Sequence, residues 1–220
     1  MSRRTIGAVL AVVGALLLAD AALTLLWREP VSWALHRGDQ AQLRERLAQA
    51  QRDGALAPGA TDAQGPAAAM AHAARRLGRS AQPGDPLGSI SIPRIGARFV
   101  VVEGTGRDEL REGPGHYVHT ALPGESGTVG LAGHRTTYQQ PFRSIDALAP
   151  GDRIVVRMPY GRFTYRVTGT RIVAPSQVSV LARASSGDQL VLTACHPLFS
   201  ARQRIVVTAR LTAAEPRMRS

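Results

Sequence analysis

The amino-acid sequence predicts a mainly β protein: a closed or nearly closed β-barrel of about eight strands with short helices, preceded by an N-terminal transmembrane helix and a linker. From residue 87 onward, short runs of branched and aromatic residues recur between turns of Gly, Pro and Asp, which is typical of strands. These runs are SISIPRI, RFVVVEG, GTVGLAGH, RIVVRM, RFTYRVTGTRIV, QLVLTAC and QRIVVTARL. About 125 residues with this pattern suit a barrel. Only Arg107–Glu112 and Pro141–Leu148 indicate short helices.

The N-terminus predicts a membrane anchor. Residues 6–27 form an apolar run interrupted only by Asp20 and Thr24, and this run is long enough to cross a bilayer. Arg3 and Arg4 precede it, so the positive-inside rule keeps the N-terminus in the cytoplasm and places the rest outside the cell. A cleaved signal peptide is the alternative, because residues 19–21 (Ala-Asp-Ala) fit a small-x-small cleavage site.

Composition divides the chain into four segments. We expect residues 1–30 to hold a cytoplasmic stub and the transmembrane anchor, and residues 31–86 to hold a short helix and a flexible extracellular linker. Residues 53–86 are rich in Ala, Gly, Pro and Gln and contain few side chains that bury a large surface, which favours a linker. Residues 87–212 form the predicted catalytic barrel, and residues 213–220 form a tail.

Charge and cysteine content exclude several classes of function. The formal net charge is +11, and every Lys or Arg position is an arginine. Aromatic residues make up 5 % of the chain and no nucleic-acid motif is present, so we predict no nucleic-acid partner. Attraction to anionic lipid or to an anionic wall polymer is favoured instead. Cys195 is the single cysteine, which excludes an internal disulfide and a cysteine-based zinc site.

Strand alternation places three chemically active side chains on one surface. Successive side chains of a strand point to opposite faces. The more apolar face of QLVLTAC ends at Ala194, which leaves Cys195 on the other face. The same alternation in QRIVVTARL and TVGLAGH places Arg204 and His134 opposite the apolar faces of their strands. A thiol, an imidazole and a guanidinium at three strand ends favour a groove on the outside of the barrel.

Each of these residues also has an ordinary structural interpretation. A lone cysteine is often a small buried hydrophobic residue, and an arginine in this chain is often simply solvated. The combination favours catalysis, because cysteine chemistry needs a thiolate, a proton donor for the leaving group and a donor for the oxyanion. His196 adjoins Cys195 but points to the opposite face, so His134 is the favoured partner. Arg202 shares the parity of Arg204 and stays an alternative.

Metal sites are not predicted. His116 and His119 have the spacing H-x-x-H and could be joined by His196, but no predicted helix aligns them and no carboxylate lies nearby in the sequence. Glu125 and Asp146 fit turn and surface positions better than a calcium site. We therefore predict neither a metal nor a cofactor.

Two segments resemble the active-site motifs of sortases. LTACHPLFSARQR resembles the sortase signature T-L-x-T-C with an arginine nine residues after the cysteine, and LAGHRTTYQQPF resembles the segment that carries the sortase histidine. The strings GPGHY and GHRTT are most similar to class E sortases, the housekeeping type of Gram-positive bacteria. Ala194 and Val191 depart from the threonines usual at these positions, and we expect only packing changes from them.

The resemblance implies a membrane-anchored cysteine transpeptidase that acts on cell-wall sorting signals. Cys195 would form a thioacyl intermediate, His134 would exchange protons with the leaving and incoming amines, and Arg204 would bind the oxyanion. The implied substrate-binding residues are Tyr117, Thr193 and Val180.

The same resemblance implies the substrate and the partners. The signal would be of the Leu-Ala-x-Thr-Gly type, or Leu-Pro-x-Thr-Gly, cut between Thr and Gly. Partners would be surface proteins that bear C-terminal sorting signals, a lipid-linked stem peptide that supplies the cell-wall precursor amine, and the membrane.

Two other functions stay open at the level of the sequence. An L,D-transpeptidase also uses Cys, His and Arg, but its signature places Ser-His-Gly before the cysteine, whereas this chain has Leu-Thr-Ala at residues 192–194. The second alternative is a non-catalytic β-domain that binds wall polymer through its arginines.

Overall fold

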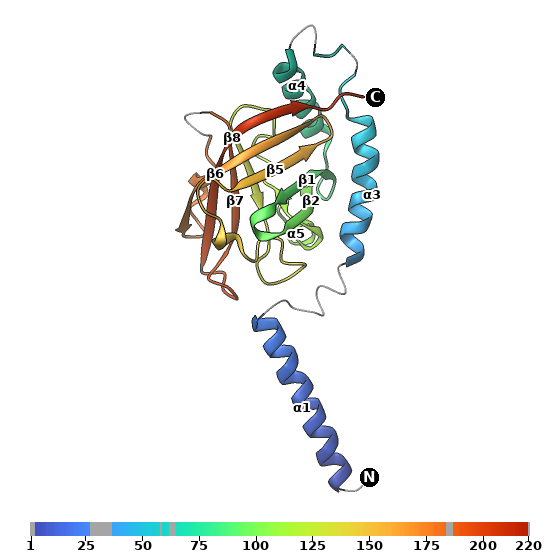
Figure 1. The fold of residues 1–220 in the computed structure, drawn as a ribbon, viewed down its shortest axis with the longest axis vertical. Coiled ribbons are helices and arrows are strands. Elements are labelled where there is room, and N and C mark those ends of the chain that lie inside the picture. Colours follow the sequence, from blue (N-terminus) through green and yellow to red (C-terminus); the bar gives the residue numbers. More distant parts are fainter. Residues whose placement is uncertain (1–2, 27–36, 58, 62–64, 184–186, 220) are drawn as a thin grey trace.

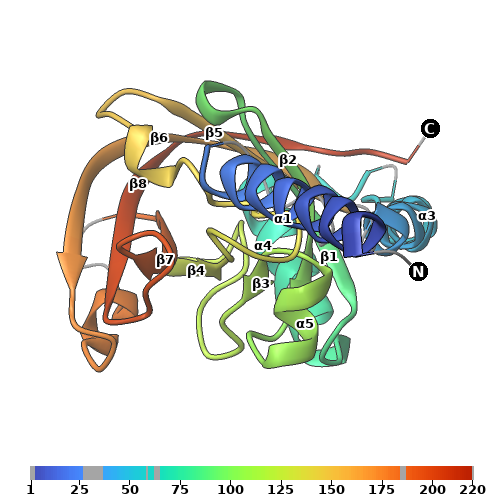
Figure 2. The ribbon, with the colours of Figure 1, turned by 90° about the horizontal axis from the view of Figure 1, so that it is seen from below.

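Eight strands close into a single barrel, as predicted. The computed structural model describes residues 3–26, 37–57, 59–61, 65–183 and 187–219. Around the barrel the strands follow the order β1-β2-β3-β4-β7-β8-β6-β5 (Figures 1 and 2). The strands are β1 Pro86–Ile92, β2 Ala97–Glu103, β3 Gly115–His116, β4 Thr128–Ala132, β5 Arg153–Met158, β6 Gly161–Val173, β7 Gln189–His196 and β8 Gln203–Pro216.

The barrel interior confirms the predicted alternation of side chains. Leu190, Leu192 and Ala194 of β7 all belong to the main core, together with the alternate residues of β4 and β8. Val191 lies on the outer face of β7, in a separate small cluster with Val206 of β8. The outer face of the wall formed by β4, β7 and β8 is therefore the surface on which Cys195 lies.

Short elements differ in part from the sequence prediction. Helix α5, Arg107–Glu112, has the predicted bounds. The helix predicted at Pro141–Leu148 is reduced to a 3₁₀ turn, η2, at Ile145–Ala147. Gly115–His116 in GPGHY, which lies outside the predicted strands, forms β3, which pairs with β2 in parallel and with β4 antiparallel. A two-residue strand contains too few residues for an alternating pattern, so periodicity does not reveal it.

Two helices before the barrel pack on it (Figure 1). Helix α3, Arg37–Asp53, lies along β1 and β2 and buries Leu43 and Leu47 against Val100 and Val102 of β2. The Gln40 side chain accepts a hydrogen bond from the Val100 N–H at 2.9 Å. The part of the expected segment at residues 31–36, including Leu35, lies outside the described residues.

Residues 53–86, predicted as a flexible linker, contain a helix that completes the core. Helix α4, Gly65–Ser80, buries Ala69, Met70, Ala73 and Ala74 in the main barrel core. The composition misled the prediction because the buried stripe of α4 consists mostly of alanine. Alanine buries little area but allows close approach, and its spacing in α4 is that of an amphipathic helix.

The predicted C-terminal tail also differs. Strand β8 continues to Pro216, so most of the tail belongs to the barrel. Leu56, from the predicted linker, donates its N–H to the Arg217 carbonyl at 2.9 Å and accepts the Arg219 N–H at 2.8 Å. Segments from both ends of the chain therefore pair beside the barrel.

The N-terminal run forms helix α1, Arg3–Leu26. Within the part of the chain that the structure describes, no helix combines the length and the apolar character needed to cross a membrane. The predicted transmembrane anchor is therefore not confirmed, and Trp27 at the end of the predicted run lies outside the described residues.

The role of α4 can be tested through its core residue. Met70→Ala should lower the free energy of unfolding by about 2–5 kcal/mol, because it leaves a cavity under the barrel. His72→Ala, on the exposed side of the same helix, should change it by less than about 0.5 kcal/mol. Denaturant unfolding of both variants measures the difference. Equal changes in the free energy of unfolding in the two variants would mean that α4 acts as a linker.

Candidate active site

The candidate site lies on the outer wall of the barrel, where β4, β7 and β8 are neighbours (Figure 2). Cys195 is the penultimate residue of β7 and is partly exposed. Arg204 is its direct partner across the antiparallel β7–β8 pair. Directly opposed residues of such a pair point to the same face with Cβ atoms about 4.5–5.5 Å apart. The side chains of Cys195 and Arg204 therefore leave neighbouring backbone positions on the same outer surface.

His134 reaches the same surface from the other side of β7. The last residue of β4, Ala132, pairs in parallel with Thr193, and the Gly133 N–H donates to the Thr193 carbonyl at 3.1 Å. His134 stands two residues after Ala132, as Cys195 stands two residues after Thr193. The parallel register thus ends two residues before His134 on one strand and two residues before Cys195 on its neighbour, which lies about 4.8 Å away.

The His134 ring is partly buried, and this burial lowers the pKa of His134 below its ordinary value of 6.5. Desolvation is the physical cause, since it penalises the charged imidazolium form. The Tyr138 ring contributes to the enclosure, with its centroid 5.0 Å from that of His134. The neutral imidazole is therefore the more populated form at neutral pH.

Arg135 fixes the loop that follows His134. Its side chain is 1 % exposed, its Nε donates to the Arg143 carbonyl at 3.1 Å, and its Nη2 forms an ion pair with Asp146 at 2.7 Å. The Phe142 N–H closes the loop by donating to the His134 carbonyl at 3.0 Å. A buried guanidinium with these partners restrains the loop, and the loop restrains the imidazole.

The same loop carries unusual backbone conformations. Tyr138, Gln139 and Gln140 have φ angles of 49°, 64° and 53°, a region that residues other than glycine seldom adopt. Gly133 is required for close packing, because a Cβ there would lie 2.6 Å from the Phe142 ring. Strained backbone of this kind persists only where surrounding contacts hold it, and it is common at functional sites.

Two of the predicted substrate-binding residues contact each other directly. The Tyr117 hydroxyl forms a 2.9 Å hydrogen bond with the hydroxyl of Thr193, and Thr193 lies on the outer face two residues before Cys195. The Tyr117 ring lies over Gly130 of β4, where a Cβ would come within 3.0 Å of it. Tyr117 therefore stands over the wall next to the thiol, and glycine at 130 provides the space.

Val180, the third predicted substrate-binding residue, lies further along the same outer face. It belongs to the 3₁₀ turn η3, Val178–Leu181, and packs with Val173, Val191 and Val206. Val178 of the same turn is 73 % exposed. The β6–β7 connection thus covers part of the outer wall, and its residues 184–186 lie outside the described residues.

The competing residues lie elsewhere. His196 is within 3.4 Å of the Arg135 guanidinium through its Nδ1, so it contacts the supporting arginine. Arg202 is exposed and precedes the first residue of β8, so it lacks the direct pairing with Cys195 that Arg204 has. The register therefore separates Arg204 from Arg202, which parity alone could not do.

His116 has a structural environment that the sequence did not indicate. It is buried, its Nδ1 lies 3.1 Å from both carboxylate oxygens of Glu103, and its Nε2 lies 3.0 Å from the Thr120 hydroxyl. His119 is exposed. Across the described residues, no group of three or more His, Cys, Asp or Glu side chains is arranged to hold a metal ion. The Glu103–His116 pair instead anchors the segment that carries Tyr117.

Cys195 and Arg204 thus lie on one outer surface, and the chain reaches His134 two residues after the end of β4. Arg204 already donates from Nη1 to the carbonyls of Ala201 and Gln203, both at 3.0 Å. Its Nε and Nη2 carry further N–H donors. This arrangement is suited to acyl transfer through a thioester, in which an oxyanion forms next to the thiol. The fold and the site define a β-barrel protein with a candidate Cys–His–Arg centre.

Comparison with known proteins identifies the family. The sortase domain model matches residues 90–212, which cover the barrel from β1 through most of β8. The chain belongs to the sortase family.

Several sortases are similar to this chain. Sortase D of Bacillus subtilis is 38 % identical over 114 residues, which cover 52 % of this chain and 56 % of that protein. Sortase SrtE1 of Streptomyces coelicolor is 33 % identical over 158 residues, 65 % of this chain and 45 % of that protein. The chain thus spans about half the length of these curated relatives. The crystal structure of sortase E1 from Streptomyces coelicolor with a tripeptide in the active site is 32 % identical, with a TM-score of 0.58, covering 62 % of this chain and 94 % of that one.

Sequence reasoning missed the supporting residues of the site. Arg135 and Asp146 form an ion pair but lie far apart in the sequence. Because the chain is rich in arginine, the sequence does not distinguish Arg135 from its other arginines. Glu103 ends β2 and meets His116 only because β2 and β3 pair in parallel, with these two residues in register. No local sequence pattern predicts such contacts.

Proposed function

We propose that this chain is a cysteine transpeptidase that cleaves a sorting signal between Thr and Gly and transfers the new carboxyl end to an amine of a cell-wall precursor. Strand register supports this most directly, because Arg204 pairs with Cys195, and β4, which precedes His134, pairs in parallel with β7 up to Thr193. We refer to His134, Cys195 and Arg204 as the proposed catalytic row. Membership of the sortase family supports the same reaction.

In the first half of the reaction, the Cys195 thiolate attacks the threonine carbonyl carbon. A C–S bond forms, and the π electron pair moves to the oxygen, where the Arg204 donors stabilise it. When the tetrahedral intermediate collapses, the C–N bond to glycine breaks. His134 as imidazolium gives its proton to the departing amine, which leaves a thioester and a neutral imidazole.

In the second half, the acceptor amine attacks the thioester carbonyl. Neutral His134 takes a proton from this amine, the C–S bond breaks, and Cys195 returns to the thiolate. One amide bond has replaced another, so protons and electrons balance among the two substrates and the three residues.

The pocket for the signal would lie along the outer face beside Cys195. Tyr117 and Thr193 would meet the backbone just before the scissile bond, and the cluster around Val180 would receive the apolar leucine. If the phenol donates to Thr193, its oxygen still has a lone pair to accept a substrate N–H. An alanine in the second position of the signal supplies that N–H, whereas a proline has none.

The first prediction concerns the covalent intermediate. Incubation with a Leu-Ala-x-Thr-Gly peptide should give a thioacyl adduct on the wild type, detected by mass spectrometry, and none on Cys195→Ala. Arg204→Gln should lower kcat by about 10²–10³-fold, the usual effect of losing an oxyanion donor. Arg202→Gln is the matched control and should stay near wild type. Equal losses in both arginine variants would refute the assignment of Arg204.

The second prediction concerns pH. Because the reaction needs a thiolate and an imidazolium together, kcat/KM should follow a bell-shaped profile. Burial lowers the pKa of His134, so the limb that reports His134 should lie below pH 6.5. Tyr138→Ala exposes the ring and should move that limb to higher pH, whereas His119→Ala, at an exposed histidine, should leave it in place. Activity that still rises through pH 10 would contradict an imidazolium donor.

The third prediction concerns the choice of signal. One hydrogen bond from the alanine N–H to Tyr117 is worth about 0.5–1.5 kcal/mol, so Leu-Ala-x-Thr-Gly should exceed Leu-Pro-x-Thr-Gly about three- to tenfold in kcat/KM. Tyr117→Phe should abolish this preference without removing the ring. Equal rates for the two peptides on wild type would reject the preference, and an unchanged preference in Tyr117→Phe would assign it to another group.

The last prediction concerns location. The apolar run at residues 6–27 behind Arg3 and Arg4 supports a membrane-anchored enzyme whose barrel lies outside the cell. The protein isolated from membranes should keep its N-terminus, and protease added to intact cells should reach the barrel. N-terminal sequencing that begins at Ala22 would show cleavage and a secreted enzyme.

A further inference from the structure

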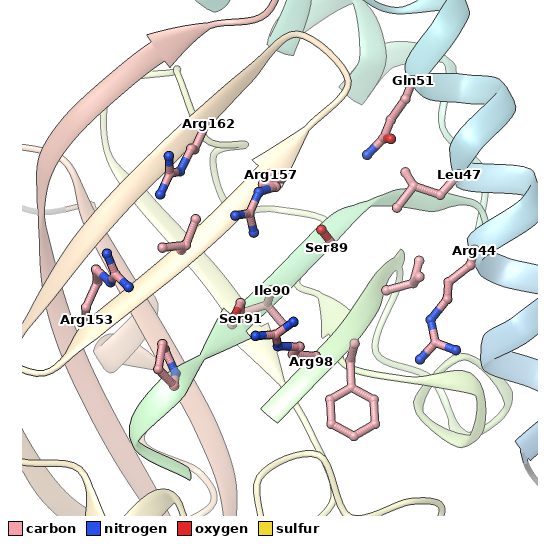
Figure 3. Close-up of a pocket in the computed structure, with 14 residues that line it drawn as sticks. Arg44, Leu47, Gln51, Ser89, Ile90, Ser91, Arg98, Arg153, Arg157 and Arg162 are labelled. Carbon is pink, nitrogen blue, oxygen red and sulfur yellow. The ribbon is translucent and has the colours of Figure 1, made fainter. Parts of the chain in front are cut away.

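A basic groove lies on a part of the barrel wall that the proposed reaction does not use. It has a volume of about 610 Å³ and runs over β1, β2, β5 and β6, with helix α3 along one edge. Figure 3 shows Arg153, Arg157 and Arg162 on one side of the groove and Arg44 of α3 on the other, with Ser89 and Ser91 between them. In Figure 2, β1 lies across the barrel from β7 and β8, which carry Cys195 and Arg204.

The groove concentrates positive charge, and among the described residues only one of its arginines, Arg162, has an ion-pair partner. Five arginines line it and no acidic residue does: Arg44, Arg98, Arg153, Arg157 and Arg162. The first four have exposed side chains and make no ion pair with any described residue. Arg162 lies 3.6 Å from Glu215. A concave surface with one sign of charge attracts counter-ions more strongly than the same charges spread over the molecule.

The strand registers place like charges directly opposite each other. Arg157 pairs with Arg162, and Arg153 pairs with Arg166, across β5 and β6. Directly opposed like charges destabilise a sheet. Both members of the pair Arg157–Arg162 line the groove, and so does Arg153 of the second pair. An anion bound between the guanidinium groups would relieve this repulsion.

The floor of the groove is suited to phosphate. Ser89 is the cross-strand partner of Arg157, and Ser91 is the cross-strand partner of Arg98. Each hydroxyl thus stands beside a guanidinium, and both groups donate hydrogen bonds to anionic oxygens. Arginine binds phosphate with two parallel N–H donors, which makes these short-range pairs specific for such groups.

Helix α1, which precedes α3 in the chain, indicates the source of the phosphate. Helix α1 exposes large apolar side chains, among them Leu10, Leu16, Leu17 and Leu18, which water solvates poorly. The chain from Leu26 to Arg37, where α3 begins, spans at most about 40 Å when fully extended. A lipid phase that takes up α1 would therefore lie within reach of the α3 edge of the groove.

We propose that this groove is a docking surface for the anionic headgroups of a phospholipid bilayer. With this wall on the membrane, the wall that carries Cys195 stays accessible to other molecules. The inference does not depend on the transpeptidase reaction, because no residue of the groove belongs to the Cys–His–Arg site.

Arginine-specific modification of the full chain tests the proposal. The chain would be bound to vesicles of phosphatidylglycerol and phosphatidylcholine or of phosphatidylcholine alone, treated with phenylglyoxal and analysed by peptide mass spectrometry. Modification on the anionic vesicles should be at least about fivefold slower at Arg44, Arg98, Arg153 and Arg157. This factor corresponds to the binding free energy that one basic residue usually contributes near an anionic membrane surface. The exposed Arg75, Arg76 and Arg79 of α4 should react equally on both.

A pair of variants checks that the groove acts as a unit. In Arg98→Gln/Arg153→Gln/Arg157→Gln, the remaining Arg44 should lose its protection on anionic vesicles. In Arg75→Gln/Arg76→Gln/Arg79→Gln, which removes the same charge, Arg44 should keep it. Both variants should retain the far-UV circular dichroism of the wild type.

Other outcomes would overturn the assignment. Equal protection of groove and α4 arginines would mean general attraction of a basic protein. Protection by lipid-free polyglycerol phosphate without protection by anionic vesicles would make the groove a site for wall polymer. Modification rates that are the same on both kinds of vesicle would mean that the groove does not face the membrane.

Discussion

The candidate site depends on the register of one strand, β7, with its two neighbours. Antiparallel pairing with β8 sets Arg204 opposite Cys195, and parallel pairing with β4 ends at Ala132 and Thr193, two residues before His134 and Cys195. Because side chains alternate with a period of two, a shift of one residue would turn Cys195 into the core and Ala194 out to solvent. The alternation of apolar residues in the barrel core therefore also fixes the catalytic face. The strand register that packs the interior therefore also determines where the site lies.

Around this row, buried polar groups hold the segments that strand pairing does not reach. Arg135 donates a hydrogen bond to a carbonyl and forms an ion pair with a carboxylate in the loop after His134, and Glu103 contacts His116 beneath the segment of Tyr117. Burying such groups costs free energy unless each finds its partners. Here the partners come from the loops themselves, so the loops have few alternative arrangements. The strained backbone at Tyr138 to Gln140 is held within this framework.

A closed barrel allows two surfaces with different chemistry on one small domain. The wall of β4, β7 and β8 carries a thiol, an imidazole and an apolar cluster, whereas the wall of β1, β2, β5 and β6 carries arginines and serines. Because the inward side chains of both walls form the apolar core, the outward side chains of the two walls can differ in charge and polarity. Helices α3 and α4 add to this division, because α3 borders the basic groove and α4 packs its alanine face into the core.

The sequence by itself determined the features that repeat along a strand or are encoded in short motifs. Seven of the strands, helix α5, and the outward parity of Cys195, Arg204 and His134 followed from period-two alternation and turn residues. The tertiary structure decided what depends on partners distant in the chain: β3, the packing of α4, the direct pairing of Arg204 with Cys195 and the contacts of Arg135. These depend on which strands pair and in which register. Strand pairing is a long-range property, because each contact joins residues that are far apart in the sequence. A local sequence pattern therefore does not predict it.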